Sequence, residues 1–209
     1  MTNATNAPSD PGDLVLWQGW EPRRAVDLEQ AIALLTGSEH RGELFVLDGV
    51  AARGFRPPRL LTVTPVVCAT APEHETPDEL RQVWAVTYRQ IAETAPRQSA
   101  PYAIYLLGVN PPDGLSPEEL AEFNSFYTDV HLREVAERRH ALRAVRYERV
   151  EVIKPPYPSA PSYLAAYELD EASAAVRRHT GPAYSRGPAV WQQHTTPWRL
   201  WYILRSSAA

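Results

Sequence analysis

The spacing of apolar residues divides the chain into segments of two kinds. Helical spacing or helix-start signals predict helices at 23–37, 76–95, 116–139 and 171–180. Runs rich in β-branched and aromatic residues predict strands at 43–50, 59–70, 102–110, 141–154, 162–170 and 198–207. A further short apolar stretch covers residues 14–20. The pattern therefore predicts a fold that mixes helices and strands.

Two of the predicted helices begin with clear capping signals. In the segment 76–95, Thr76 is placed as the N-cap, Pro77 occupies the first helical position, and Glu79 completes a capping box. Ser116 stands in the same relation to a glutamate three residues later, so the segment 116–139 also has the start of a helix.

The order of the elements predicts a fold class. Between residues 102 and 207 they follow β-α-β-β-α-β, which is the ferredoxin-like order. We therefore expect an α+β protein whose ferredoxin-like unit forms an α/β barrel, either with a second, degenerate ferredoxin-like N-terminal half or with another subunit. The expected divisions are a disordered tail at 1–12, an N-terminal half at 13–97 and a ferredoxin-like half at 98–209.

A polar cluster interrupts the apolar stripe of the helix predicted at 116–139. On a helical wheel at about 100° per residue, His131 falls in the middle of the stripe that should pack on the sheet. Asn124, Tyr127 and Glu134 fall beside it. Buried polar groups need hydrogen-bond partners, and such conflicts with packing often mark a site. The alternative is structural, with His131 donating to a backbone carbonyl and Tyr127 reaching the rim.

Three short motifs carry a resemblance to a known family. They are the pair Phe126-Tyr127, the segment His131-Leu132-Arg133-Glu134, and the pair Arg146-Tyr147. In sequence and spacing they resemble the EthD-like families of the dimeric α/β-barrel superfamily, over roughly residues 102–207. The chain departs from the family pattern at Arg133, where a proline is common, and at 139–141, where the family has a Pro-Gly-aromatic turn.

The resemblance implies a function as well as a fold. It implies a pocket between sheet and helices in which a histidine shuttles protons, without a cofactor or metal. We expect a lyase or isomerase, of the cyclase or decarboxylase type, that acts on a hydrophobic polyketide-like or aromatic substrate in secondary metabolism. The expected catalytic residues are His131, whose ordinary pKa suits proton transfer near pH 7, together with Tyr127 and Arg146.

Aromatic residues supply the expected pocket wall. Residues 181–202 form the densest aromatic stretch of the chain, which suits either a flat pocket wall or a sealed core or dimer contact. The expected substrate-binding residues are Asn124, Glu134, Tyr105, Tyr147, Trp191, His194, Trp198 and Trp201.

Composition narrows the class of protein. The chain has 209 residues, of which 44% are hydrophobic and 22% charged, so it can bury a substantial core. The net charge of −4 gives no basic footprint for nucleic acid, and no apolar run is long enough for a membrane helix. Cys68 is the single cysteine, which excludes an intrachain disulfide. We expect a cytoplasmic protein whose partners are a small hydrophobic substrate and, where the barrel closes between subunits, a second copy.

Two alternatives to the enzyme remain open. One is a non-catalytic ligand-binding or accessory partner of a biosynthetic enzyme, which a closed cavity below about 300 Å³ beside His131 would favour. The other is a haem enzyme of the same superfamily with His131 as the axial ligand.

Overall fold

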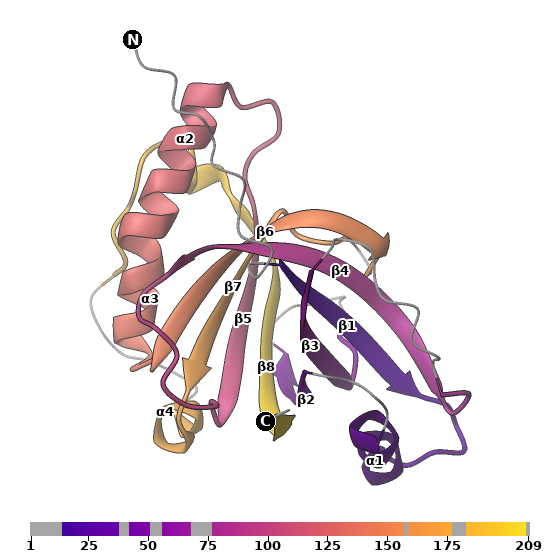
Figure 1. Cartoon of the computed structure of the whole chain (residues 1–209). Helices are drawn as coiled ribbons and strands as arrows, with labels where there is room; N and C mark the ends of the chain where they lie inside the picture. Colours follow the sequence, from indigo (N-terminus) through magenta and orange to yellow (C-terminus); the bar gives the residue numbers. More distant parts are fainter. Residues whose placement is uncertain are drawn as a thin grey trace.

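A computed structural model describes residues 14–37, 42–50, 56–67, 77–156, 159–176 and 183–207. Its strands form one closed barrel in which every pair of neighbours is antiparallel, in the order β1-β3-β2-β8-β5-β7-β6-β4 (Figure 1). The strands are β1 (Leu14–Pro22), β2 (Glu43–Val50), β3 (Leu60–Val66), β4 (Leu80–Glu93), β5 (Ala103–Asn110), β6 (Arg143–Lys154), β7 (Tyr163–Leu169) and β8 (Thr195–Ser207).

Helices cover parts of the outer surface of the barrel. They are α1 (Leu28–Gly37), α2 (Pro117–Phe126), the π-helical turn η2 (Tyr127–His131), α3 (Leu132–Arg138), α4 (Glu171–Ala175) and the 3₁₀ turn η3 (Trp191–Gln193). The segments α2, η2 and α3 run as one long helix along the side of the barrel formed by β6 and β7, whereas α1 lies by the N-terminal strands (Figure 1). The capping box predicted at Ser116 is confirmed, with bonds in both directions to Glu119.

Side-chain alternation along the strands gives the barrel wall two buried faces. On β5, Ile104 and Leu106 belong to the core inside the barrel, while Tyr105 and Leu107 belong to a second core beneath the long helix. On β6, Arg146 and Tyr147 divide in the same way, since only Tyr147 is part of the inner core. Because both faces of the wall are covered here, β5 and β7 read as almost continuous apolar runs.

Aromatic side chains fill one end of the barrel. Trp84 and Trp198 meet edge to face with ring centroids 4.5 Å apart, and neither side chain is more than 1% exposed. The hydroxyl of Tyr88 donates to the carbonyl of Pro161 at 3.0 Å, and that of Tyr202 donates to the carbonyl of Pro58 at 2.9 Å. An eight-stranded barrel encloses just enough space for side chains or one small ligand, and this end is occupied by side chains.

The expected ferredoxin-like α/β barrel is wrong. All eight strands belong to one antiparallel barrel that closes within a single chain, with strands from both the N-terminal and C-terminal parts of the sequence as neighbours. For example, β8 pairs with β2 on one edge and β5 on the other. The C-terminal elements lie where the pattern predicted them. Their strands, however, are part of the single barrel and do not form a separate ferredoxin-like sheet.

The helix predicted at 76–95 is also wrong, because the described part of this segment contains β4. Thr76, the predicted N-cap, lies outside the described residues. In β4, Trp84, Val86 and Tyr88 point into the inner core at every second position. Pairing with β1 on one edge and β6 on the other closes the barrel, and this tertiary pairing outweighs the local helix-start signals.

The π-helical turn changes which side of the long helix faces the barrel. Leu132 N–H donates to the carbonyl of Tyr127, five residues earlier instead of four. Such a turn holds an extra residue and rotates the positions that follow it. The buried stripe therefore passes from Phe123 and Tyr127 to Leu132 and Val135. His131 lies beside this stripe and not at its centre, and 15% of its side chain is exposed.

Candidate functional site

The barrel wall has a cavity on each of its faces. The helix-side pocket has a volume of about 290 Å³ and is lined by Tyr105, Leu107, Val109, His131, Val135, Arg139, Tyr184, Ser185, Trp191, His194, Thr196 and Arg199. The barrel cavity has a volume of about 350 Å³ and is lined by Val15, Trp17, Gly42, Glu43, Phe45, Val63, Pro65, Gln90, Arg97, Ile104, Arg143, Tyr147, Ala166, Glu168 and Ser207.

His131 lies on the wall of the helix-side pocket among aromatic rings. Its imidazole centroid is 4.7 Å from that of Trp191 and 5.3 Å from that of Tyr184. Its Nδ1 has no hydrogen-bond partner and lies 4.0 Å from a carboxylate oxygen of Glu134. The structural alternative, in which His131 donates from this nitrogen to a backbone carbonyl, is therefore wrong for Nδ1.

The pKa of His131 is lowered to about 4: burial contributes most, the charge of Glu134 opposes it, and the neighbouring His194 and Arg138 add to the lowering. Removing the imidazole from water disfavours its charged form. At neutral pH the ring is therefore uncharged, so it offers a lone pair to a ligand in the pocket.

The segment that covers the pocket is held by Glu134 and Trp191. Glu134 accepts hydrogen bonds from the backbone N–H of Ser185 at 3.2 Å and from its hydroxyl. The Trp191 ring packs on Phe126 at 5.3 Å, and His194 stacks on Trp191 at 4.2 Å. The His194 Nδ1 lies 2.6 Å from the carbonyl of Trp191, which fixes this second imidazole at the pocket.

Two arginines give the helix-side pocket an excess of positive charge. The Arg139 guanidinium stacks on Tyr105, with its Cζ 3.7 Å from the ring centroid, and its Nε has no hydrogen-bond partner. Arg199 lies on the exposed rim. Within the described part of the chain, no carboxylate forms an ion pair with either arginine. An anionic ligand would supply the charge that this pocket lacks.

The predicted catalytic partners of His131 lie beneath the pocket and do not line it. Arg146 is 1% exposed and donates to the backbone carbonyl of Asn124, to its side-chain oxygen at 2.5 Å and to the hydroxyl of Thr128 at 2.7 Å. Its guanidinium is sandwiched between the rings of Tyr127 and Tyr163, at 4.4 and 4.3 Å. These bonds hold the helix where the π-helical turn begins, so Arg146 and Asn124 have a structural role in this arrangement.

Tyr127 is sealed in the same layer. It is fully buried, its hydroxyl has no hydrogen-bond partner, and burial raises its pKa above the ordinary value despite the charge of Arg146. The hydroxyl therefore stays protonated and lies away from the helix-side pocket.

The predicted aromatic residues divide between the two faces of the wall. Tyr105, Trp191 and the neighbouring Trp201, whose ring is 4.3 Å from that of Tyr105, lie on the helix side. Tyr147 lines the barrel cavity, and Trp198 is buried in the filled end of the barrel. The structure therefore brings together His131, Tyr105, Trp191 and His194, with Glu134 beside them, and separates them from Tyr147 and Trp198.

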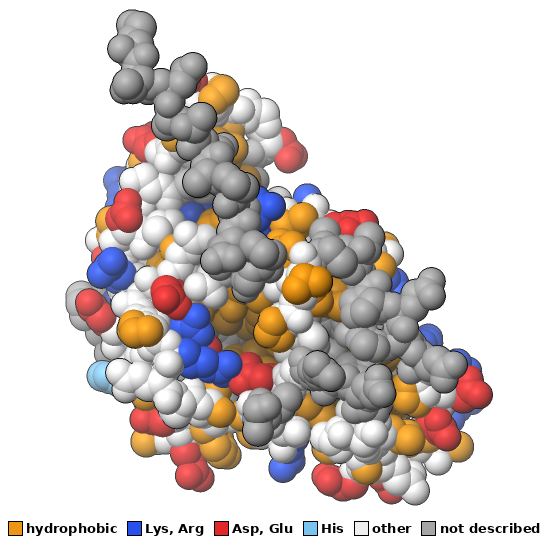
Figure 2. All heavy atoms as spheres, in the orientation of Figure 1, with side chains coloured by type: hydrophobic (Ala, Val, Ile, Leu, Met, Phe, Trp, Pro, Cys, Tyr) orange, Lys and Arg blue, Asp and Glu red, His pale blue; other side chains and the backbone are white. Residues whose placement is uncertain are grey.

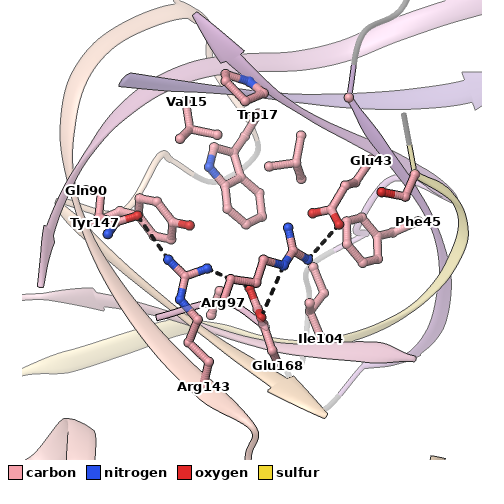
Figure 3. A pocket seen from close by; sticks show the side chains of 15 residues that line it. Val15, Trp17, Glu43, Phe45, Gln90, Arg97, Ile104, Arg143, Tyr147 and Glu168 are labelled. Carbon is pink, nitrogen blue, oxygen red and sulfur yellow. Dashed lines mark hydrogen bonds and ion pairs between the residues drawn. The ribbon is translucent and has the colours of Figure 1, made fainter. Parts of the chain in front are cut away.

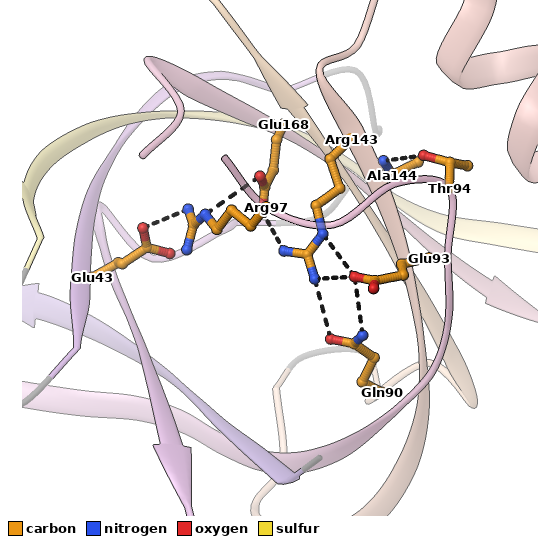
Figure 4. A network of polar contacts seen from close by, with 8 residues as sticks. All are labelled: Glu43, Gln90, Glu93, Thr94, Arg97, Arg143, Ala144 and Glu168. Atoms are coloured by element: carbon orange, nitrogen blue, oxygen red, sulfur yellow. Dashed lines mark hydrogen bonds and ion pairs between the residues drawn. The ribbon is translucent and has the colours of Figure 1, made fainter. Parts of the chain in front are cut away.

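A chain of alternating charges runs along the wall of the barrel cavity (Figure 4). Arg97 donates to Glu43 at 2.6 Å and lies 3.4 Å from Glu168. Arg143 donates to the same Glu168 at 3.1 Å and, through its Nε, to Glu93 at 3.0 Å. Burial raises the pKa of Glu168, and the two guanidiniums oppose this rise.

Apolar and aromatic side chains complete this cavity. Figure 3 shows Trp17, Phe45 and Ile104 around the space, with Arg97, Arg143 and Glu168 along one side. Sequence analysis missed this site because its charged residues are far apart in the chain. Glu168 gave the one available signal, because it is a carboxylate within an otherwise apolar strand segment.

Other kinds of site find little support in the described residues. Among them, no group of three or more histidine, cysteine, aspartate or glutamate side chains is arranged to hold a metal ion. Sites for drug-sized ligands usually measure about 300–1,000 Å³, and a haem is at least as large as such ligands, so a pocket of about 290 Å³ beside His131 is too small for one. None of the described helices combines the length and apolar character needed to cross a bilayer.

The visible surface carries mixed charge. In Figure 2, acidic and basic side chains of the described residues are interspersed with apolar ones, without a broad area of one sign. No protein-family model matches the chain, and no curated protein matches its sequence. The resemblance to the EthD-like families therefore stays a prediction that rests on the motifs around His131 and Arg146.

Proposed function

We propose that the protein is a small-molecule enzyme that moves a proton on a hydrophobic carboxylic acid, with His131 as the acid and base. The observation that supports this proposal most is the composition of the helix-side pocket. An uncharged imidazole lines it together with aromatic rings and two guanidiniums, Arg139 and Arg199, that have no carboxylate partner among the described residues.

Each group has a distinct part in the proposed chemistry. The substrate carboxylate pairs with the arginines, and the apolar body of the substrate packs on Trp191 and Tyr105. His131 removes a proton from a carbon next to a carbonyl, and the electron pair moves onto the carbonyl oxygen as an enolate. The imidazolium then returns the proton to another atom of the substrate, which completes an isomerisation. Arg146, which was also expected to be catalytic, lies beneath the pocket and takes no part in this proposal.

The negative charge of the substrate carboxylate would also make His131 a stronger base. A free imidazole with a pKa of about 4 is a weak base. A bound carboxylate favours the imidazolium and raises this pKa toward neutrality, where general acid–base catalysis works best. The proposed reaction therefore depends on an acidic substrate for binding and for activating His131.

Phenylpyruvate is a suitable probe, because it combines an aromatic ring, a carboxylate and an enolisable carbon. We expect the protein to accelerate exchange of its benzylic protons in D₂O, followed by proton NMR, with saturation at high probe concentration. His131→Gln should lower the turnover number at least about 100-fold, since a positioned acid or base contributes about 10²–10⁴-fold. Arg199→Gln should instead raise KM, by about tenfold, because it weakens pairing with the carboxylate.

Arg133→Gln is the matched control for the arginine. Arg133 is exposed on the same long helix and does not line the pocket, so exchange should be unchanged. Wild-type exchange no faster than buffer, or a folded His131→Gln variant with the wild-type rate, would contradict the proposal.

A binding protein without catalysis is the second candidate. The observation that favours it is the pocket volume of about 290 Å³, at the lower limit of ordinary ligand sites. In that case phenylpyruvate binds, with affinity lowered by Arg199→Gln, while its protons exchange at the buffer rate.

A further inference from the structure

The barrel cavity has a polar group that its own walls leave without a partner. Tyr147 is 7% exposed and lines the cavity. Figure 3 shows its hydroxyl directed into the cavity beside the indole of Trp17, whose ring centroid is 5.6 Å from that of Tyr147. Trp17 is 2% exposed, and its Nε1 has no hydrogen-bond partner. A buried polar group without a partner costs free energy, so an occupant that accepts a hydrogen bond from Trp17 Nε1 would be stabilised, and the Tyr147 hydroxyl can donate to the same occupant.

The charges around the cavity are already compensated by one another. Each of Arg97 and Arg143 lies between two carboxylates, and they share Glu168 (Figure 4). Among the residues that line the cavity, the two carboxylates Glu43 and Glu168 balance the two guanidiniums. An anionic ligand would therefore find no free guanidinium on the described wall, and a cation would find no free carboxylate.

The remaining walls are apolar and aromatic. Trp17, Phe45 and Ile104 offer flat or branched apolar surfaces at the same end of the barrel. The volume of about 350 Å³ falls within the range of small-molecule sites, and barrel mouths are common places for them. An eight-stranded barrel can hold one small ligand in its interior, and here the opposite end is filled by tryptophan and tyrosine side chains.

We propose that the barrel cavity is a second binding site, which takes an uncharged planar aromatic molecule of one or two fused rings bearing a carbonyl oxygen. The carbonyl accepts a hydrogen bond from the Tyr147 hydroxyl, and the rings pack on Trp17 and Phe45. This site is separate from the helix-side pocket, because Tyr147 and Arg146 are successive residues of β6 that point to opposite faces of the wall.

Three probes of similar shape test the proposed chemistry by isothermal titration calorimetry. Coumarin carries the required carbonyl and no charge, naphthalene lacks the carbonyl, and coumarin-3-carboxylate adds a negative charge. We expect coumarin to bind about tenfold more tightly than naphthalene, since one hydrogen bond to a buried group is worth about that factor. Coumarin-3-carboxylate should bind at least tenfold more weakly than coumarin in this cavity, because its carboxylate would lose water without gaining a free cationic partner. Isotope-filtered NOEs from coumarin to the ring protons of Trp17 and Phe45 would locate the bound probe.

Tyr147→Phe and Tyr167→Phe form a matched pair. Both tyrosines are buried, but Tyr167 belongs to the core on the helix side, its hydroxyl is buried without a hydrogen-bond partner, and it does not line the cavity. Tyr147→Phe should weaken coumarin binding about tenfold and leave naphthalene unaffected, whereas Tyr167→Phe should change neither. The proposal is overturned if coumarin shows no saturable binding up to about 1 mM, if the paired variants have equal effects, or if the NOEs arise from Trp191. Ordered water alone in the cavity would give the first of these results.

Discussion

The two cavities share a wall, yet they handle charge in opposite ways. In the barrel cavity each guanidinium lies between two carboxylates, which come from β2, β4 and β7. In the helix-side pocket Arg139 and Arg199 have no such partner among the described residues, and the nearby carboxylate of Glu134 is engaged with Ser185. The charges of the barrel cavity are therefore paired without a ligand, whereas an anionic ligand would pair with the arginines of the helix-side pocket.

The difference follows from how each side is built. The inner face is surrounded by strands whose register brings charged side chains from distant parts of the sequence within hydrogen-bond distance. On the outer face a helix and the segment at 183–194 cover the wall, and their aromatic rings leave few acceptors for the arginines. Compensated charge suits an uncharged ligand, and uncompensated charge suits an acid whose proton is to be moved.

Adjacent residues of β6 give the largest expected contrast between the two sides. Arg146→Met should lower the free energy of unfolding by about 3–4 kcal/mol, because it leaves the oxygens of Asn124 and Thr128 without their charged donor. Tyr147→Phe removes only a hydroxyl that faces the barrel cavity and should change stability by less than about 1 kcal/mol. Urea denaturation measures both. A neutral or stabilising Arg146→Met would mean that desolvation of the guanidinium outweighs its bonds.

Stability against pH tests the burial of His131. Its pKa is about 4 in the folded protein and 6.5 when unperturbed. Between these values the unfolded chain binds the proton and the folded protein does not, so stability falls as pH falls from about 6.5 to about 4. The total loss from this group is about 2–3 kcal/mol. His131→Gln should not show this loss. Urea denaturation of both proteins between pH 7 and pH 4 should therefore show the free energy of unfolding of the wild-type protein falling by that amount relative to the variant. If the stability of both proteins depended on pH in the same way, His131 would be exposed to water and would keep its ordinary pKa.

Part of the fold and of the site could be predicted from the sequence. The C-terminal strands and the start of the long helix follow from patterns within one segment, and Ser116 caps that helix as expected. The barrel does not follow, because its closure depends on pairing between distant strands. In β4 the local helix-start signals favoured a helix. The alternation of the buried residues Trp84, Val86 and Tyr88 instead fits a strand, and pairing with β1 and β6 stabilises that strand.

The candidate site shows a similar limit. A wheel with 3.6 residues per turn placed His131 in the middle of the stripe that packs on the sheet, whereas His131 lies beside that stripe and 15% of its side chain is exposed. The π-helical turn rotates this part of the helix. Arg146, fifteen residues beyond His131, donates to the helix from the sheet just before this turn. His131 lines the helix-side pocket, but the arginines of that pocket come from the end of α3 and from β8, and the meeting of these segments is determined only by the barrel.

Replacing either of two glycines by alanine tests how tightly the helix-side pocket is covered. These substitutions have the smallest expected effect on stability. Gly187 and Gly114 both have positive φ, 69° and 75°, so replacement by alanine should cost each about 1 kcal/mol of backbone strain. At Gly187 a Cβ would also lie 2.7 Å from the rings of Phe126 and Trp191, whereas at Gly114 it would meet nothing within 4 Å. Gly187→Ala should therefore lose about 1–2 kcal/mol more than Gly114→Ala in urea denaturation, and it should weaken phenylpyruvate binding while coumarin binding in the barrel stays unchanged. Equal losses would show that the covering segment shifts freely, and a simultaneous loss of coumarin binding would show that the two faces of the wall are coupled.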